Sequence, residues 1–242
     1  MKSRGYSVFA GLWLGAMGAF IAAVAFHYFT RGEVASAFVS LGGAAFFFGL
    51  VIPLFRTVPG RVTPRIQPDG QGTTFRPDLG VDIPVQISLA GLVTASVLTV
   101  ILLPLGRFAI PVPSNMRYAL PFTTAIIAVC GTPLLWRNLR RGSSRYLRLT
   151  VDGFEVADGW SPRSANWSSL EDIASEAPNQ KTPTPGVIAF VMADDAVWTL
   201  TALAFTPGGT ALRDLVRFYW QHPERRDELI DGRAEERLAA RL

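Results

Sequence analysis

The sequence has few of the residues that metal and redox sites use. It contains one cysteine, Cys130, and two histidines, His27 and His222, in 242 residues. Neither histidine has a carboxylate or cysteine at ligand spacing, so the sequence predicts no metal site. Cys130 lies inside an apolar run, and a single cysteine excludes an intrachain disulfide. We interpret His27 as an interfacial residue and His222 as a residue at a helix boundary.

Motifs for nucleophilic or phosphate chemistry are also missing. Ser143 and Ser144 lack the Gly-x-Ser-x-Gly context of a nucleophile elbow. Gly70 and Gly72 flank Gln71, but the lysine and the following helix of a phosphate-binding loop are absent. We therefore expect no cofactor and no enzymatic activity.

Charged residues are absent from four long apolar runs, at about 8–29, 34–55, 83–105 and 118–136. Runs of about 20 such residues can cross a bilayer core of roughly 30 Å. The first run could also be a signal peptide, since Ala23-Val24-Ala25 resembles a cleavage site, but we expect it to be a span. Ion and proton pathways usually need charged groups inside the bundle, so a channel or a proton-coupled transporter is disfavoured.

Lysine is rare as well: only Lys2 and Lys181 are lysines among 23 basic residues. This arginine bias fits a GC-rich bacterial genome. The basic residues gather at the ends of the apolar runs, which favours membrane topology over nucleic-acid binding as the cause of the net charge of +4. The N-terminus, the loop 56–82 and the segment after residue 136 are the most basic. The positive-inside rule then predicts a plasma-membrane protein with both termini in the cytoplasm.

Two groups of residues in the membrane domain, expected at 1–142, have a predicted role in packing or anchoring. Small residues recur every fourth position in the first run, which favours close helix packing within the bundle and leaves a homodimer open; they are Gly11, Gly15, Ala19 and Ala23. Arginines after the fourth run are expected to attract anionic lipid headgroups; they are Arg137, Arg140, Arg141 and Arg145. Within the cytoplasmic loop 56–82, the segments 62–67 and 73–76 form either a small hairpin or an unstructured loop.

The remainder of the chain predicts a soluble β-rich domain at 145–222. An Asp-Gly pair joins strands expected at 145–151 and 154–157, which is a strong hairpin signal. Further strands are expected at 163–167, 170–174, 187–192 and 196–200, with a polar loop at Ala177–Pro185 and an amphipathic helix at 212–220. A charged helix is expected at 223–242, and its apolar stripe could dock on the domain or on a partner; the stripe includes Leu229, Ile230 and Leu238.

These elements resemble the bacterial pleckstrin-homology-like (PH-like) domain. The residues that carry the resemblance are the hairpin Leu147–Val156, the segment Trp167–Ile173, the helix Leu212–Trp220 and the tail His222–Ala234, which looks like one seen in actinobacterial multi-pass membrane proteins. The resemblance implies a β-barrel or sandwich closed by a C-terminal helix. Such domains usually have more strands than the five or six expected here, and the hairpin 62–76 is a possible donor.

The fold class expected from the sequence is thus a four-helix membrane bundle followed by a cytoplasmic PH-like domain. Phosphoinositide binding through the first hairpin turn is not expected, because only Arg148 precedes that turn. We expect a non-enzymatic accessory or scaffold subunit that binds a protein partner in an envelope complex. The alternative is a protein that transports or senses lipid-like molecules.

Overall fold

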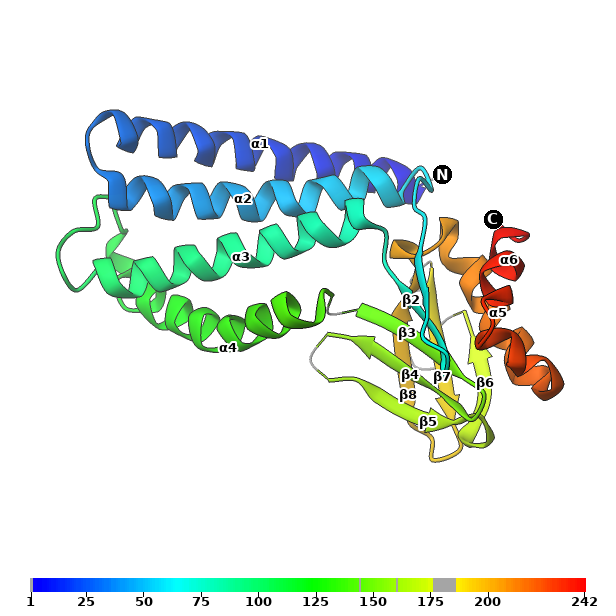
Figure 1. The fold of residues 1–242 in the computed structure, drawn as a ribbon. Coiled ribbons are helices and arrows are strands. Elements are labelled where there is room, and N and C mark those ends of the chain that lie inside the picture. Colours follow the sequence, from blue (N-terminus) through cyan, green and yellow to red (C-terminus); the bar gives the residue numbers. More distant parts are fainter. Residues whose placement is uncertain (1, 144, 160, 176–185) are drawn as a thin grey trace. The chain divides into compact units, whose positions relative to one another are not determined.

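The computed structural model describes residues 2–143, 145–159, 161–175 and 186–242. The chain forms two compact units, each built from two stretches of sequence (Figure 1). The helical unit comprises Met1–Phe55 and Ile83–Gly142, and the β unit comprises Arg56–Asp82 and Ser143–Leu242. The loop 56–82, expected to be part of the membrane domain, therefore belongs to the β unit. The expected loop Ala177–Pro185 lies outside the described residues.

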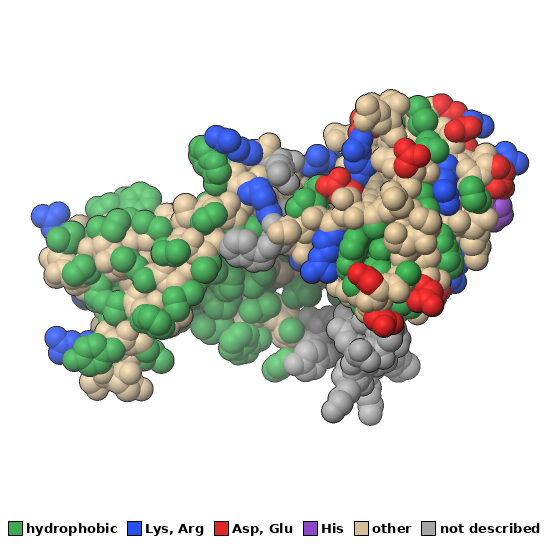
Figure 2. All heavy atoms as spheres, turned by 90° about the horizontal axis from the view of Figure 1, so that it is seen from below, with side chains coloured by type: hydrophobic (Ala, Val, Ile, Leu, Met, Phe, Trp, Pro, Cys, Tyr) green, Lys and Arg blue, Asp and Glu red, His purple; other side chains and the backbone are tan. Residues whose placement is uncertain are grey.

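Four helices in the described part of the chain are long and apolar enough to cross a membrane. They are α1 (Lys2–Thr30), α2 (Val34–Thr57), α3 (Leu79–Leu102) and α4 (Ala119–Arg141), with a short 3-10 helix, η1 (Ser114–Met116), before α4. On the face shown in Figure 2, apolar side chains cover the helical unit, whereas acidic side chains gather on the β unit. This distribution is the one expected for helices in lipid joined to a domain in water.

Two of these helices have bounds that differ from the sequence prediction. α3 begins at Leu79 rather than at Ile83, because the Asp78 carboxylate accepts the N–H of Gly80 at 2.7 Å and caps the first turn. α4 continues beyond Trp136 to Arg141. It ends where Gly142 takes a left-handed conformation, φ 75°, and donates its N–H to Asn138.

Glycines allow the backbones of α2 and α3 to approach each other closely. A Cβ built on Gly91 would lie 2.5 Å from the Gly42 carbonyl oxygen, and one built on Gly49 would lie 2.4 Å from the Pro84 carbonyl oxygen. The Ser88 hydroxyl donates to the Phe46 carbonyl at 2.8 Å across the same contact. Because dispersion contacts hold helices together in lipid, such close backbone approach stabilises the pair.

The small residues of α1 pack differently from the predicted stripe. Gly11 is buried, and a Cβ there would meet the Phe55 ring at 3.3 Å. Gly15 has nothing within 4 Å, and Ala19 and Ala23 are exposed. Positions four apart drift by about 40° per step on a helix, so a stripe at that spacing leaves the packed face. The buried positions recur every seven residues instead, at Gly11, Gly18 and Ala25.

The β unit contains two antiparallel sheets. The first has the order β1-β2-β3-β4-β5, with β1 (Arg65–Pro68), β2 (Gly72–Arg76), β3 (Arg145–Thr150), β4 (Gly153–Asp158) and β5 (Arg163–Asn166). The second has the order β6-β7-β8, with β6 (Leu170–Ala174), β7 (Val187–Met192) and β8 (Val197–Thr201). Short 3-10 helices follow β5 and β8; they are η2 (Trp167–Ser169), η3 (Ala202–Ala204) and η4 (Pro207–Gly209).

The hairpin from the loop between α2 and α3 completes the first sheet. β2 pairs with β3 from Gly72 opposite Thr150 to Phe75 opposite Leu147. Phe75 is fully buried, and its hydrophobic cluster includes Leu147 and Leu149. Of the two alternatives for this loop, the hairpin is therefore correct, and it supplies both strands and core to the β unit.

The C-terminal segment packs onto this core. α5 (Thr210–Gln221) buries the apolar face predicted from its spacing. The segment after it contains the 3-10 helix η5 (Pro223–Leu229) and α6 (Arg233–Ala239), not one continuous helix. The break lies at Gly232, whose φ of 86° is incompatible with a right-handed helix. Leu229 and Leu238 are fully buried in the chain's own core.

Candidate functional site: a groove along strand β5

A groove runs along the outer edge of β5. Its larger part has a volume of about 860 Å³ and lies beside Ser164–Ser169, and a second part of about 440 Å³ lies beside Ser161 and Arg163. Trp198 of β8 lines both parts. We call the two parts together the β5 groove.

The sheet order explains why the β5 groove is open. Among the described residues, β5 is the last strand of the first sheet and pairs only with β4, and β8 is the last strand of the second sheet and pairs only with β7. An edge strand leaves one row of backbone N–H and C=O groups without a strand partner. Two strand edges thus border the groove.

An aromatic cluster forms one wall of the groove. The Phe154 ring stacks on Phe190 with centroids 5.2 Å apart and contacts Trp198 at 6.0 Å and Trp167 at 5.4 Å. Phe154 is buried, whereas Trp198 is partly exposed. Arg163 lies over the Trp198 ring with its guanidinium carbon 5.9 Å from the centroid. This wall offers apolar contact area to a ligand.

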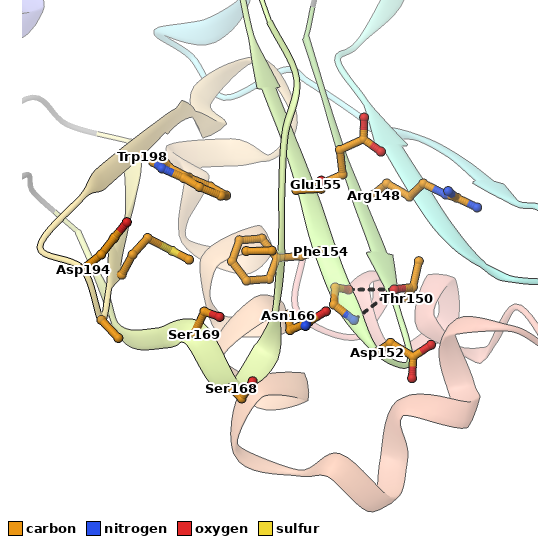
Figure 3. A pocket seen from close by; sticks show the side chains of 15 residues that line it. Arg148, Thr150, Asp152, Phe154, Glu155, Asn166, Ser168, Ser169, Asp194 and Trp198 are labelled. Atoms are coloured by element: carbon orange, nitrogen blue, oxygen red, sulfur yellow. Dashed lines mark hydrogen bonds between the residues drawn. The ribbon is translucent and has the colours of Figure 1, made fainter.

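The other wall is polar. Successive side chains of a strand point to opposite faces of the sheet, so Glu155 lies on the opposite face from Phe154. Arg148 and Ser164 pair with Glu155 on the neighbouring strands and therefore share its face. In Figure 3, Phe154 and Trp198 lie on one side of the strands, and Arg148 and Glu155 lie on the other. The edge strand therefore separates an apolar half of the groove from a polar half.

Acidic side chains outnumber basic ones in the larger part of the groove. Asp152, Glu155 and Asp194 line it together with Arg148. The Arg148 guanidinium already pairs with Asp69 at 2.7 Å. Within the described residues, no ion pair involves Asp152 or Asp194, and Glu155 accepts a hydrogen bond from the Tyr146 hydroxyl. The groove therefore favours a cationic ligand over an anionic one.

A second polar network lies where the β unit continues from α2 and into α3. Asp78 accepts hydrogen bonds from the backbone and hydroxyl of Thr63, both at 3.1 Å, and pairs with Arg56 at 3.1 Å. Burial alone would raise the pKa of Asp78, but the hydrogen bonds from Thr63 and Gly80 outweigh it and hold that pKa below its usual value.

Asp82 extends this network to the start of β3. It pairs with Arg65 at 2.7 Å and accepts the Ser143 hydroxyl at 3.0 Å. Ser143 in turn accepts the N–H of Arg145 at 3.2 Å. We infer that Asp78 and Asp82 position the chain segments that enter the β unit, a structural role that the sequence alone did not indicate.

The predicted anionic-lipid arginines differ in their contacts within the chain. Arg145 pairs with Asp158 at 2.9 Å, and Arg140 lies over the Trp136 ring at 4.5 Å. Arg137 and Arg140 belong to the last turns of α4, where positive charge also complements the helix dipole. The side chain of Arg141 lies outside the described atoms. Their interaction with lipid stays a prediction.

Two of the three predicted docking residues are unavailable to a partner. Leu229 and Leu238 are fully buried, and only Ile230 is exposed, at 39%. The apolar stripe of the tail thus docks on the domain itself. The Thr73 hydroxyl donates to the Leu229 carbonyl at 2.6 Å, which links the tail to the hairpin from the α2–α3 loop.

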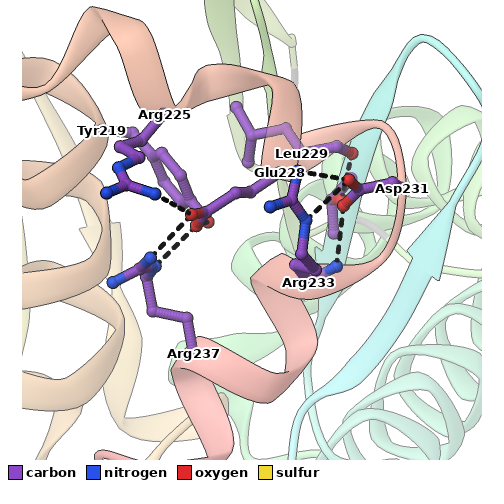
Figure 4. Close-up of polar contacts among 8 residues, drawn as sticks. Tyr219, Arg225, Glu228, Leu229, Asp231, Arg233 and Arg237 are labelled. Atoms are coloured by element: carbon purple, nitrogen blue, oxygen red, sulfur yellow. Dashed lines mark hydrogen bonds and ion pairs between the residues drawn. The ribbon is translucent and has the colours of Figure 1, made fainter.

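An ion pair with a buried carboxylate holds the tail in place. Glu228 accepts two hydrogen bonds from Arg237, both at 2.7 Å, and one from the Tyr219 hydroxyl at 3.3 Å (Figure 4). The Glu228 side chain is 4% exposed. Arg237 holds the pKa of Glu228 below its usual value, whereas burial raises the pKa of Tyr219 to about 12. Both groups therefore keep their neutral-pH charge states.

Replacing Glu228 with glutamine should release the tail. We expect the free energy of opening of segment 223–239 to fall by about 2–3 kcal/mol, because Arg237 loses a charged acceptor. Because folding lowers the pKa of Glu228, the ion pair with Arg237 stabilises the tail at neutral pH. This stabilisation is lost progressively as the pH falls below about 4.3, the ordinary pKa of a glutamate, and the carboxylate becomes protonated. Hydrogen exchange of the purified protein at pH 7 and at lower pH would measure both effects. Glu236→Gln, at an exposed residue of α6 in the same tail, is the matched control and should change nothing.

No family model, no curated protein and no solved structure matches the chain. The groove and the networks above therefore have to be interpreted from their own chemistry. In the part of the chain that the structure describes, no group of three histidine, cysteine, aspartate or glutamate side chains could hold a metal ion. The sequence prediction missed the aromatic wall and the acidic rim, because both depend on which strands lie at the edges of the sheets.

Proposed function

We propose that the chain is a non-enzymatic accessory or scaffold subunit of a membrane complex, and that its β unit is a PH-like module that binds another protein. The observation that carries this proposal is the shared sheet: β1 and β2 come from the loop between α2 and α3, and β3 follows α4. The connecting segments 58–64, 77–78 and 142–144 are short. Three span ends are thus joined to one module by short segments, which limits the reach of the module.

The two antiparallel sheets followed by the amphipathic helix α5 support the PH-like interpretation. The basic segments at Lys2–Arg4, 56–76 and 137–148 support a cytoplasmic location for the module and for both termini. A module of this kind, tethered at three points, suits the capture of a partner that is itself in or at the membrane. Because its connecting segments are short, the module cannot reach as far as a domain on a long flexible linker could.

Purification from the native host tests the proposal. The tagged full-length protein, extracted in mild detergent and analysed by mass spectrometry, should carry another protein in stoichiometric amount. A tagged membrane protein of similar size and abundance serves as the control and should not retain that partner. Recovery of the protein without any stoichiometric partner would contradict the proposal.

A second candidate function has one specific observation in its favour. An apolar notch of about 320 Å³ lies between α1 and α2. It is lined by alanine, phenylalanine and leucine side chains alone, namely Ala22, Ala25, Phe26, Phe29, Ala37, Phe38 and Leu41. Such a notch could hold an acyl chain, as transport or sensing of a lipid-like molecule would require. Stoichiometric co-purified lipid in the absence of a protein partner would favour this function over the first.

A further inference from the structure

We propose that the β5 groove binds an extended, lysine- or arginine-containing segment of a partner membrane protein, which adds to the edge of β5 as a new strand. This inference rests on the proposed function and names the binding site and the chemistry of the partner. It combines three observations on the groove: the open strand edge, the different chemistry of its two walls, and its acidic rim.

The shape of the groove fits a strand better than a compact ligand. The groove follows β5 past Trp198, from Ser161 to Ser169. A peptide that pairs with an exposed edge gains main-chain hydrogen bonds along its length, and its side chains then alternate between the two faces of the sheet. A compact ligand would use only one of these faces.

The two faces define which side chains the segment should carry. On one face, an apolar side chain would rest near Phe154, Met192 and Trp198. On the other face, the neighbours of Ser164 and Asn166 are Glu155 and Gly153 by strand register. Alternation of apolar and polar residues in the partner segment follows directly from this arrangement.

The acidic rim requires positive charge on the polar positions. Asp152, Glu155 and Asp194 lie along the larger part of the groove, and Arg148, the arginine among the residues that line this part, is paired with Asp69. The same rim repels anionic lipid headgroups, which argues against a phosphate-bearing lipid as the occupant. Cytoplasmic segments next to membrane spans are rich in lysine and arginine, and a module joined to three span ends meets such segments at close range.

Pairing should be limited to a short segment. β5 spans Arg163–Asn166, and Pro162, which has no backbone N–H, precedes it. A partner strand can therefore pair over only a few residues, and its side-chain contacts must supply much of the affinity. Trp198 and Asp194 are the residues whose replacement should weaken binding most.

Fluorescence anisotropy with synthetic peptides tests the inference on the full-length protein in detergent. A peptide of alternating valine and lysine should bind. A version with proline at two central positions, and a version of alternating valine and glutamate, should not. Asp194→Lys and Trp198→Ala should each weaken binding by about tenfold or more, whereas Asp214→Lys on the exposed face of α5 should leave it unchanged.

Some results would overturn the inference. Equal binding of the lysine peptide and its proline version would mean charge attraction without strand pairing. Unchanged binding in the Asp194 and Trp198 variants would place the site elsewhere, and preferential binding of vesicles with anionic lipid would replace the peptide by a lipid.

Purification from the host separates this inference from the proposed function. If the partner is retained by wild type but lost from Asp194→Lys, both stand. If the variant retains the partner, assembly stands and the groove inference falls. If wild type has no partner, the proposed function itself fails.

Discussion

Replacing Gly91 with leucine should separate α2 from α3 and lower the apparent Tm of the protein in detergent by about 10 °C, since overpacking against a backbone atom costs about 3 kcal/mol. A Cβ on Gly91 would lie 2.5 Å from the Gly42 carbonyl oxygen and 2.9 Å from the Ala45 Cβ. Backbone atoms of a helix cannot move aside as a flexible side chain can, so the two helices would have to move apart. The contacts that pass through Gly42, Gly49 and Ser88 would be lost together.

Gly15 provides the matched control for this change. It is a glycine of another span, and nothing lies within 4 Å of a Cβ built on it. Gly15→Leu should therefore leave the Tm unchanged or raise it slightly, because leucine has a better helix propensity than glycine. Differential scanning fluorimetry of both variants, with size-exclusion chromatography to detect aggregation, would compare them. Equal Tm values for the two variants would show that the α2–α3 contact does not hold the unit together.

The spans were the most predictable part of the molecule. Their signal is local, because the length of an uncharged apolar run is visible in the sequence itself, and the described residues contain four helices of this kind. The packing between spans is not local. Gly42 and Gly49, for example, lie at the contact between α2 and α3. That role depends on which face of α3 lies opposite, and a single sequence contains no signal for it.

The β unit shows the same division between local and non-local features. The six strands that the structure describes after Ser143 begin and end within one residue of their predicted positions, because alternation and turn residues specify each hairpin. Sheet order was only partly accessible: the hairpin 62–76 was a possible donor, and its pairing with β3 depends on tertiary structure. The position of β5 at an edge, and with it the groove, could not be predicted for the same reason.

The tail illustrates how a correct pattern can lead to an incomplete conclusion. The apolar stripe through Leu229 and Leu238 was recognised, and both residues are buried. The pattern did not distinguish a partner from the domain itself. Gly232 interrupts the expected helix, and the resulting bend brings Arg237 to Glu228, a pairing that helical spacing over nine residues would not have suggested.

Phe75→Ala should destabilise the β unit by about 3–5 kcal/mol, although Phe75 belongs to the loop between two spans. The ring is fully buried, and Phe75 pairs in register with Leu147 of β3. Its removal would leave a cavity in the cluster that also contains Leu149 and Phe205. Hydrogen exchange of β3 and β4 in the full-length protein would measure the loss.

Thr74→Ala is the control for Phe75→Ala, because Thr74 is the neighbouring residue on the opposite, partly exposed face of β2. It should change the exchange of β3 and β4 little. A similar small effect for Phe75→Ala would mean that the hairpin only covers the sheet and does not support it. The expected large effect would mean that residues 143–242 do not form a stable module by themselves, since they lack two strands and part of the core. The hairpin between α2 and α3 would then be a required part of the module's fold.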